Sequence, residues 1–315
     1  MQSQCIFSIQ TPGGPPVEII RHTFSSVLAK PGQRVSLVTG LHGDELEGLY
    51  ICHRLLEILK QQEEQNAIRG EVHIYPAVNP QALETGTRLW PFFSVDINRA
   101  FGKNHPPSLA AETARAVLED LKAYSDLVVD FHASNLQLME LPQIRIIKNF
   151  AKKLVPLAQL CNVDLIWVHP HADIFESTLG YNLNQAKIPT LVIEAGISLR
   201  INKNYCEQIV LGILNLLQQT GTLENTEPLA KVALPKLVQP HQVAMVQSPN
   251  AGLFVKQAEV GQTLKKGDKI GDLINANQKR EEIHSPCSGL LFTLREHPLT
   301  GKGAPLARIA IEAPA

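Results

Sequence analysis

Short apolar runs alternate with longer amphipathic stretches along roughly the first 220 residues of the chain. A short run that is apolar at almost every position is typical of a strand buried on both faces of a sheet. Such runs occupy residues 35–39, 72–75, 127–131, 164–168 and 190–194. Helices are predicted at residues 44–62, 108–124, 150–160 and 203–219. This alternation of strands and helices predicts an α/β fold.

After about residue 222 the pattern changes to short β-like runs that Gly and Pro interrupt, which is typical of a small all-β module. We therefore predict two domains, an α/β domain at 1–225 and a C-terminal β module at 226–315. Ser-Pro-Asn-Ala-Gly-Leu at 248–253 recurs as Ser-Pro-Cys-Ser-Gly-Leu at 285–290. The repeat indicates two similar halves and a flattened, barrel-like module with internal pseudo-symmetry.

The C-terminal module resembles the biotinyl/lipoyl-type hammerhead fold, in which two similar halves flank a hairpin that carries a modified lysine. The tip of that hairpin would lie at 277–279, with Lys279 as the modified residue. Lys279 stands in Gln-Lys-Arg, however, and lacks the Met-Lys-Met or Asp-Lys-Ala surroundings typical of such carriers. We therefore favour a structural or oligomerisation module over a carrier, and we expect a homo-oligomer.

Composition and charge exclude several classes of protein. Hydrophobic residues make up 44% of the chain and charged residues 19%, a balance typical of a globular protein with a packed core. Lys and Arg number 29 against 30 Asp and Glu, so no nucleic-acid partner is expected. The five cysteines include no CxxC pair, which argues against a disulfide framework and a thiolate zinc site. No apolar run reaches the ~18 residues of a membrane-spanning helix and no signal peptide is recognisable, so we expect a cytoplasmic protein without a membrane partner.

Metal-ligating residue types cluster in Gly-Leu-His-Gly-Asp-Glu-Leu-Glu-Gly at 40–48, where a predicted strand runs into a predicted helix. His42 and Glu45 are three residues apart, so a turn at the helix start would place both side chains on one side. Imidazole and carboxylate together suit zinc. His132 follows another predicted strand and would reach the same edge of the sheet. His, Glu and His leave a fourth zinc position open for water, as catalytic zinc sites do.

The chain resembles the succinylglutamate desuccinylase/aspartoacylase family, a branch of the zinc carboxypeptidase superfamily, over about residues 30–220. The resemblance rests on motifs in the family's order: Gly-x-His-Gly-x-Glu at 40–45, Asn-Pro at 79–80, Gly-Thr-Arg at 86–88, Asp-Ile-Asn-Arg-Ala-Phe at 96–101, Asp-Phe-His at 130–132, and Ile-Pro-Thr-Leu-Val-Ile-Glu-Ala-Gly at 188–196. It implies a zinc-carboxypeptidase-like mixed sheet flanked by helices. It also implies that His42, Glu45 and His132 hold one Zn²⁺ per chain.

The resemblance further implies functions for residues around the metal. Glu194 would be the general base that takes a proton from zinc-bound water and returns one to the leaving amine. Arg88 would polarise the scissile carbonyl and stabilise the developing oxyanion. Asn98 and Arg99 would hold a carboxylate of the substrate, a task that suits the planar guanidinium.

Other residues near the expected centre allow more than one interpretation. Asp130 lies two residues before His132 on one strand, so it points to the same side and is expected to orient the ligand imidazole. Glu194 could instead serve in a structural ion pair, and Arg88 could be an exposed, solvated side chain. The His-Pro-His at 169–171 could bind metal or line the pocket, but we predict no partner residues near it.

We therefore predict zinc-dependent hydrolysis of the amide bond of a small N-acylated amino acid or related carboxylate, with metal-bound water as the nucleophile. Desuccinylase, deacetylase and aspartoacylase types all stay open. A zinc carboxypeptidase would use the same centre on peptides. A non-catalytic binding or carrier protein would instead depend on the C-terminal β module.

Overall fold

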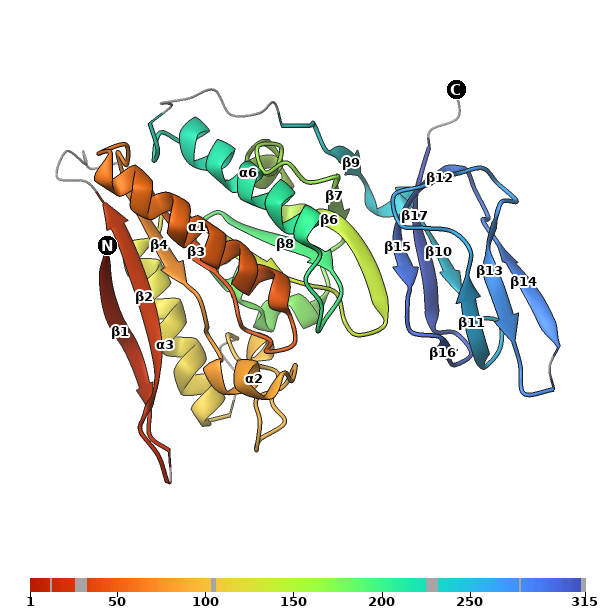
Figure 1. Ribbon diagram of the computed structural model, residues 1–315, viewed down its shortest axis with the longest axis horizontal. Helices are drawn as coiled ribbons and strands as arrows, with labels where there is room; N and C mark the ends of the chain where they lie inside the picture. The colour runs from red at the N-terminus through yellow and green to blue at the C-terminus, as the bar shows by residue number, and fades with distance from the viewer. Residues whose placement is uncertain (12, 26–32, 103–105, 225–231, 278, 313–315) are drawn as a thin grey trace.

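The structure is a computed structural model that describes residues 1–11, 13–25, 33–102, 106–224, 232–277 and 279–312. A large mixed sheet forms its centre, and the predicted α/β class is confirmed (Figure 1). The sheet order is β1-β2-β4-β3-β5-β8-β6-β15-β17-β10, and β7, β9 and β12 pair off this path. Strands β4, β3, β5 and β8 are parallel neighbours, whereas β6 runs antiparallel to β8. The strands of the α/β part are β1 (Gln2–Ile9), β2 (Val17–Ser25), β3 (Arg34–Val38), β4 (Glu71–Tyr75), β5 (Leu127–His132), β6 (Leu138–Ile147), β7 (Leu165–His169) and β8 (Thr190–Gly196).

Helices cover both faces of the parallel centre of this sheet, where strands such as β5 are apolar on both faces. On β5, Val129 belongs to the core beneath α1, α4 and α6, whereas its neighbour Val128 belongs to the core beneath α3 and α5. The helices are α1 (Leu46–Glu64), α2 (Pro80–Thr85), α3 (Leu109–Tyr124), α4 (Ala151–Ala158), α5 (Leu179–Gln185) and α6 (Lys203–Gln219), with short 3₁₀ helices η1 (Ile97–Arg99), η2 (Lys148–Phe150), η3 (Asp173–Ser177) and η4 (Pro240–Gln242). None of the helices in the described ranges combines the length and apolarity that a bilayer crossing requires.

The N-terminal hairpin β1–β2 and strand β6 were not among the predicted elements. Strand β6 interrupts its apolar residues with Glu140, Pro142, Gln143 and Arg145, so no continuous apolar run marks it. Pro142 falls where the register of the β6–β8 pairing shifts, between Glu140 and Gln143. A register shift is a position at which a sheet tolerates a residue without a backbone N–H.

The C-terminal module contains two packed antiparallel sheets. Strands β10 (Val243–Gln247), β12 (Thr263–Leu264), β15 (Gly289–Arg295) and β17 (Pro305–Ile311) belong to the large sheet, and β11 (Gly252–Lys256), β13 (Lys269–Ile274), β14 (Arg280–His284) and β16 (Leu299–Thr300) form a separate one. Apolar residues from both sheets, such as Phe254 and Leu291, share one core. The repeated motif forms the same turn twice: Ser248 Oγ donates to the carbonyl of Asn250 at 2.7 Å, and Ser285 Oγ to that of Cys287 at 2.6 Å.

The module is joined to the α/β part by hydrogen-bonded strands. Strand β15 pairs antiparallel with β6, with Thr293 opposite Glu140 and Arg295 opposite Leu138. Strand β9 (Lys236–Val238) pairs parallel with β7, so the chain after the predicted boundary first extends the α/β sheet. The predicted boundary at residues 225 and 226 lies outside the described residues.

Candidate metal centre and active-site cavity

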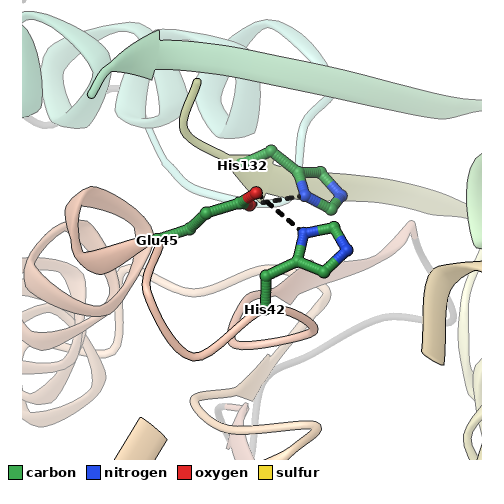
Figure 2. A group of neighbouring side chains, drawn as sticks. All are labelled: His42, Glu45 and His132. Atoms are coloured by element: carbon green, nitrogen blue, oxygen red, sulfur yellow. Dashed lines mark hydrogen bonds and ion pairs between the residues drawn. The ribbon is translucent and has the colours of Figure 1, made fainter. Parts of the chain in front are cut away.

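Three buried side chains converge at the carboxyl end of the parallel strands (Figure 2). His42 and Glu45 lie in the loop that links β3 to α1, and His132 ends the neighbouring strand β5. One ligand atom from each residue lies within 4.8 Å of the other two. Glu45 Oε1 is 2.8 Å from His42 Nδ1, and Glu45 Oε2 is 2.8 Å from His132 Nδ1. The predicted ligand residues are thus assembled as a group able to hold a metal ion.

Each of the two imidazoles contacts an aspartate through its other ring nitrogen, Nε2. His42 Nε2 lies 3.0 Å from Asp96 Oδ1, and His132 Nε2 lies 3.0 Å from Asp130 Oδ2. In metalloproteins a carboxylate on the far ring nitrogen fixes the tautomer and orientation of a ligand imidazole. Both rings therefore present Nδ1 to the space beside Glu45, which fits a metal ion. The sequence pointed to Asp130 because it shares a strand with its histidine, whereas Asp96 reaches His42 from a distant loop.

Opposite charges stabilise one another within this group. Burial alone would raise the pKa of Glu45, but His42 and His132 outweigh burial and lower it. Burial alone would lower the pKa of His132, but Asp130 and Glu45 outweigh burial and raise it. Ligand imidazoles must be neutral to bind a metal. A bound cation would therefore replace the imidazole protons as the partner of the Glu45 carboxylate.

Two glycines shape the loop that carries His42 and Glu45. Gly40 has a φ of 72°, in the left-handed region that favours glycine. Gly43 packs so closely against α2 that a Cβ at this position would lie 1.9 Å from the carbonyl of Ala82. These contacts fix the loop against α2 and thereby position both side chains.

Arg88 approaches His42, Glu45 and His132, the candidate metal-binding group, from the loop after α2. Its Nη1 donates to Glu45 Oε1 at 2.8 Å, and its Nη2 lies 3.5 Å from Asp96 Oδ2. Arg88 is therefore bound at the centre and is not the freely solvated side chain of the alternative interpretation. Its action on a substrate carbonyl stays a prediction.

Asn98 and Arg99 lie on η1 and line the same cavity as the metal-binding group. Asn98 is buried, and its Oδ1 accepts a hydrogen bond of 3.0 Å from the backbone N–H of Leu179, which ties η1 to the start of α5. Arg99 Nη1 donates to the carbonyl of Asn98 at 2.9 Å. Within the described residues Arg99 makes no ion pair, and its binding of a substrate carboxylate stays a prediction.

Glu194 lies on β8 directly opposite His132 of β5. Its Oε1 is 3.1 Å from Arg145 Nη1, so the ion pair of the alternative interpretation is present. Burial raises the pKa of Glu194, although Arg145 and His132 oppose this effect. Glu194 also lines the cavity. Its function as a general base stays a prediction that this position allows.

The cavity has a volume of about 520 Å³ and extends past Glu194 to side chains on β6, β7 and β17. Arg145 and Arg308 place their guanidinium carbons 5.9 and 5.5 Å from the ring centre of Trp167. Burial and these two arginines lower the pKa of His169 to about 3, so its imidazole is neutral at pH 7. Among the side chains at this end of the cavity, the sequence had suggested only His169 as a pocket-lining residue. Arg145 and Arg308 stand in no recognisable motif, and only the fold brings them together.

A second group of potential metal ligands is exposed and consists of His171, Asp173 and Glu176. His171 Nε2 lies 3.2 Å from Glu176 Oε1. The expectation that the His-Pro-His segment has no partner residues nearby was therefore wrong, because the turn of η3 brings two acidic residues beside His171. His169 does not belong to this group, since its ring packs against Trp167 with 3.9 Å between ring centres. Exposed ion pairs of this kind are common and do not indicate a metal.

Comparison with known proteins identifies a family for the part of the chain that contains these residues. Residues 31–220, more than half of the chain, match the succinylglutamate desuccinylase/aspartoacylase catalytic domain. N-alpha-acetyl-L-2,4-diaminobutyric acid deacetylase from Halomonas elongata is 30% identical over 111 residues. That alignment covers 35% of this chain and 31% of the relative, so it spans less than a third of the relative's length.

Solved structures share the fold over nearly the whole chain, the C-terminal module included. A succinylglutamate desuccinylase/aspartoacylase from Rhodobacter sphaeroides has a TM-score of 0.81 at 22% identity, with 99% of this chain and 96% of that chain covered. The product-bound ectoine utilization protein EutE (DoeB) from Ruegeria pomeroyi has a TM-score of 0.78 at 20% identity, with 95% and 90% covered. The domain match includes the whole metal-binding group, and the chain belongs to the succinylglutamate desuccinylase/aspartoacylase family.

Proposed function

We propose that the protein is a zinc-dependent amidohydrolase that removes the acyl group from a small N-acylated amino acid or related carboxylate. One observation carries this proposal: the buried group of His42, Glu45 and His132 lines the same cavity as Glu194 and Arg99. Candidate metal ligands, a carboxylate able to move a proton and an arginine that forms no ion pair within the described residues thus face one small space. Membership in a family of deacylases supports the same reaction class.

Zinc is the metal that this donor set favours. Two imidazoles and one carboxylate match the ligands of hydrolytic zinc sites. We propose that His42 Nδ1, His132 Nδ1 and the Glu45 carboxylate hold one Zn²⁺ per chain. Zinc supplies Lewis acidity when bound, which makes water a stronger nucleophile and the amide carbonyl a better electrophile.

The side chains of the cavity carry the remaining steps. Glu194 takes a proton from the attacking water and delivers a proton to the nitrogen of the leaving amine. Arg88 donates hydrogen bonds to the carbonyl oxygen as negative charge develops there. Arg99 and the Asn98 amide bind the substrate carboxylate and hold the scissile bond in place. The products are a carboxylic acid and a free amine.

The size of the cavity favours a small substrate over a peptide. A volume of about 520 Å³ lies in the range of pockets for small molecules. Arg308 of the C-terminal module forms part of the wall. The Halomonas relative is named as a deacetylase of a small N-acetylated amino acid, which supports the same substrate class.

The first test compares metal content and hydrolysis in the wild type, His132→Ala and His171→Ala. His171 is the matched control because it belongs to the exposed group. We expect about one zinc per chain in the wild type and in His171→Ala, and none in His132→Ala. Amine release from a panel of N-acetyl and N-succinyl amino acids should depend on zinc, stop on chelation and be lost in His132→Ala.

Other results would replace the proposal. Release of C-terminal residues from peptides, without hydrolysis of any N-acyl amino acid, would indicate a carboxypeptidase. Absence of bound metal and of hydrolysis, together with a mass increase on Lys279, would indicate a carrier. Lys279 is exposed beside the turn between β13 and β14, where such a modification would be accessible.

A further inference from the structure

A buried carboxylate lies where the two parts of the protein meet and binds to both. Glu140 of β6 is 1% exposed, and the pairing of β6 with β15 places it opposite Thr293. Its Oε1 accepts hydrogen bonds from the C-terminal module, at 2.7 Å from Arg308 Nη1 and 3.4 Å from Thr293 Oγ1. Its Oε2 accepts from the α/β part, at 2.5 Å from Arg145 Nη2 and 3.0 Å from Gln143 Nε2. Glu140 therefore couples a side chain of the module to a side chain of the cavity.

Arg145 continues this connection to Glu194. One terminal nitrogen of its guanidinium binds Glu140 and the other lies 3.1 Å from Glu194 Oε1. The sheet order β5-β8-β6-β7 places Arg145 one strand beyond Glu194, on the side away from His132. An uninterrupted series of ion pairs thus runs from Arg308 through Glu140 and Arg145 to Glu194.

The charges of this series balance, since two arginines alternate with two glutamates. Loss of Arg308 would leave Glu140 buried, with Arg145 as its one cationic partner among the residues that the structure describes. A guanidinium prefers to bind a carboxylate through two parallel N–H groups. Arg145 would then turn both terminal nitrogens to Glu140 and release Glu194.

We propose that Arg308, Glu140 and Arg145 are positioning residues that hold Glu194 in place for proton transfer, so that the C-terminal β module is part of the catalytic apparatus. This inference rests on the proposed function of Glu194 as the general base. Arg308 acts through its neighbours and needs no contact with the substrate. The module thus has a task beyond structural support, which its sequence did not indicate.

The test uses the full chain loaded with zinc and the variants Arg308→Met, Arg308→Lys and Arg280→Gln. Methionine keeps the apolar stem of Arg308 without its charge, and lysine keeps the charge. Arg280 is the matched control because its ion pair with Asp272 lies on the separate sheet of the module. We expect Arg308→Met to lower kcat about 10- to 100-fold, because a displacement of about 1 Å can cost that much. KM should stay within about threefold and zinc content unchanged, since neither depends on proton transfer.

The other variants and the separate readings of kcat and KM distinguish support for the proposal from its refutation. Arg308→Lys should recover most of kcat, and Arg280→Gln should equal the wild type. A rise in KM at constant kcat would mean that Arg308 binds the substrate itself, which would overturn the proposal. Unchanged kinetics in Arg308→Met would overturn it as well. If Arg308→Met does not fold, Arg308→Gln takes its place, and the same changes in kcat and KM decide the outcome. Glutamine can still donate one hydrogen bond to Glu140 but lacks the charge of arginine.

A structural measurement separates this inference from the proposed function. In a crystal structure of the wild type, Glu194 should contact Arg145. In a crystal structure of Arg308→Met, Glu194 should be separated from Arg145 and adopt a new orientation. An unmoved Glu194 would contradict the inference even if the wild type hydrolyses amides. If the wild type hydrolyses no amide, the proposed function fails, whereas a moved Glu194 would still confirm the positioning.

Discussion

Replacement of Asp130 by asparagine should weaken zinc binding about 100-fold, and the same change at Asp96 should weaken it about tenfold. Each aspartate lies 3.0 Å from Nε2 of one of the two histidines that we propose as zinc ligands, His42 and His132. Asparagine keeps the size of the side chain and can still accept the hydrogen bond, but it lacks the charge that makes the imidazole a stronger ligand. The loss corresponds to about 2.8 kcal/mol at Asp130 and about 1.4 kcal/mol at Asp96.

The difference between the two sites follows from their surroundings. Asp130 is 1% exposed, and within the described residues its Oδ1 has no hydrogen-bond partner, so its charge acts mainly on His132. The Asp96 side chain is 18% exposed, also accepts from the backbone N–H of Asn98, and lies near Arg88. Its charge is therefore shared and partly screened by solvent.

The assay is competition for zinc against a chelator of known affinity at constant pH, with the melting temperature of the metal-free variants as a check on folding. Asp173→Asn is the control, because Asp173 belongs to the exposed group and should not affect zinc affinity. Equal affinity in Asp130→Asn and the wild type would refute the reasoning. A larger loss at Asp96 than at Asp130 would refute the argument from burial.

Three further predictions concern stability and the loop before α1. Gly43→Ala should lower the free energy of unfolding by about 1–3 kcal/mol and reduce zinc content, because its Cβ would meet the backbone of Ala82; denaturant unfolding and metal analysis would check both. Burial raises the pKa of Glu47 from 4.5 to about 8, so the folded state keeps a proton that the unfolded state releases, and stability should fall as pH rises from about 4.5 to about 8. Glu47→Gln should remove this slope and be more stable than the wild type at pH 9, and parallel pH profiles of the two proteins in urea unfolding would argue against it. Leu55→Ala, in the fully buried core beneath α1, should cost about 2–5 kcal/mol in thermal or denaturant unfolding, and a loss below about 1 kcal/mol would contradict the packing described for this core.

The sequence predicted those features that depend on short-range patterns. The central strands are continuous apolar runs, and His42 with Glu45 form one local motif, so both were recognisable. Strand β6 was not, because its polar residues face the cavity and the C-terminal module. These polar positions, Glu140 and Arg145 among them, are part of the site.

Long-range contacts account for what the sequence did not show in the site. Asp96 meets His42 across 54 positions and Arg308 meets Glu140 across 168, and neither contact follows from residue spacing. The alternation of side chains along a strand suffices to pair Asp130 with His132. Contacts that cross from one loop or domain to another require the fold itself.

The pairing of β6 with β15 bears on the solubility of a protein shortened at its C-terminal end. A chain that ended after α6 would leave the Leu138–Glu140 segment of β6 without β15, and β7 without β9. Unpaired N–H and C=O groups along such edges are a template for pairing with other chains. Residues after the predicted boundary therefore protect the α/β sheet from self-association, and the catalytic part expressed alone should aggregate.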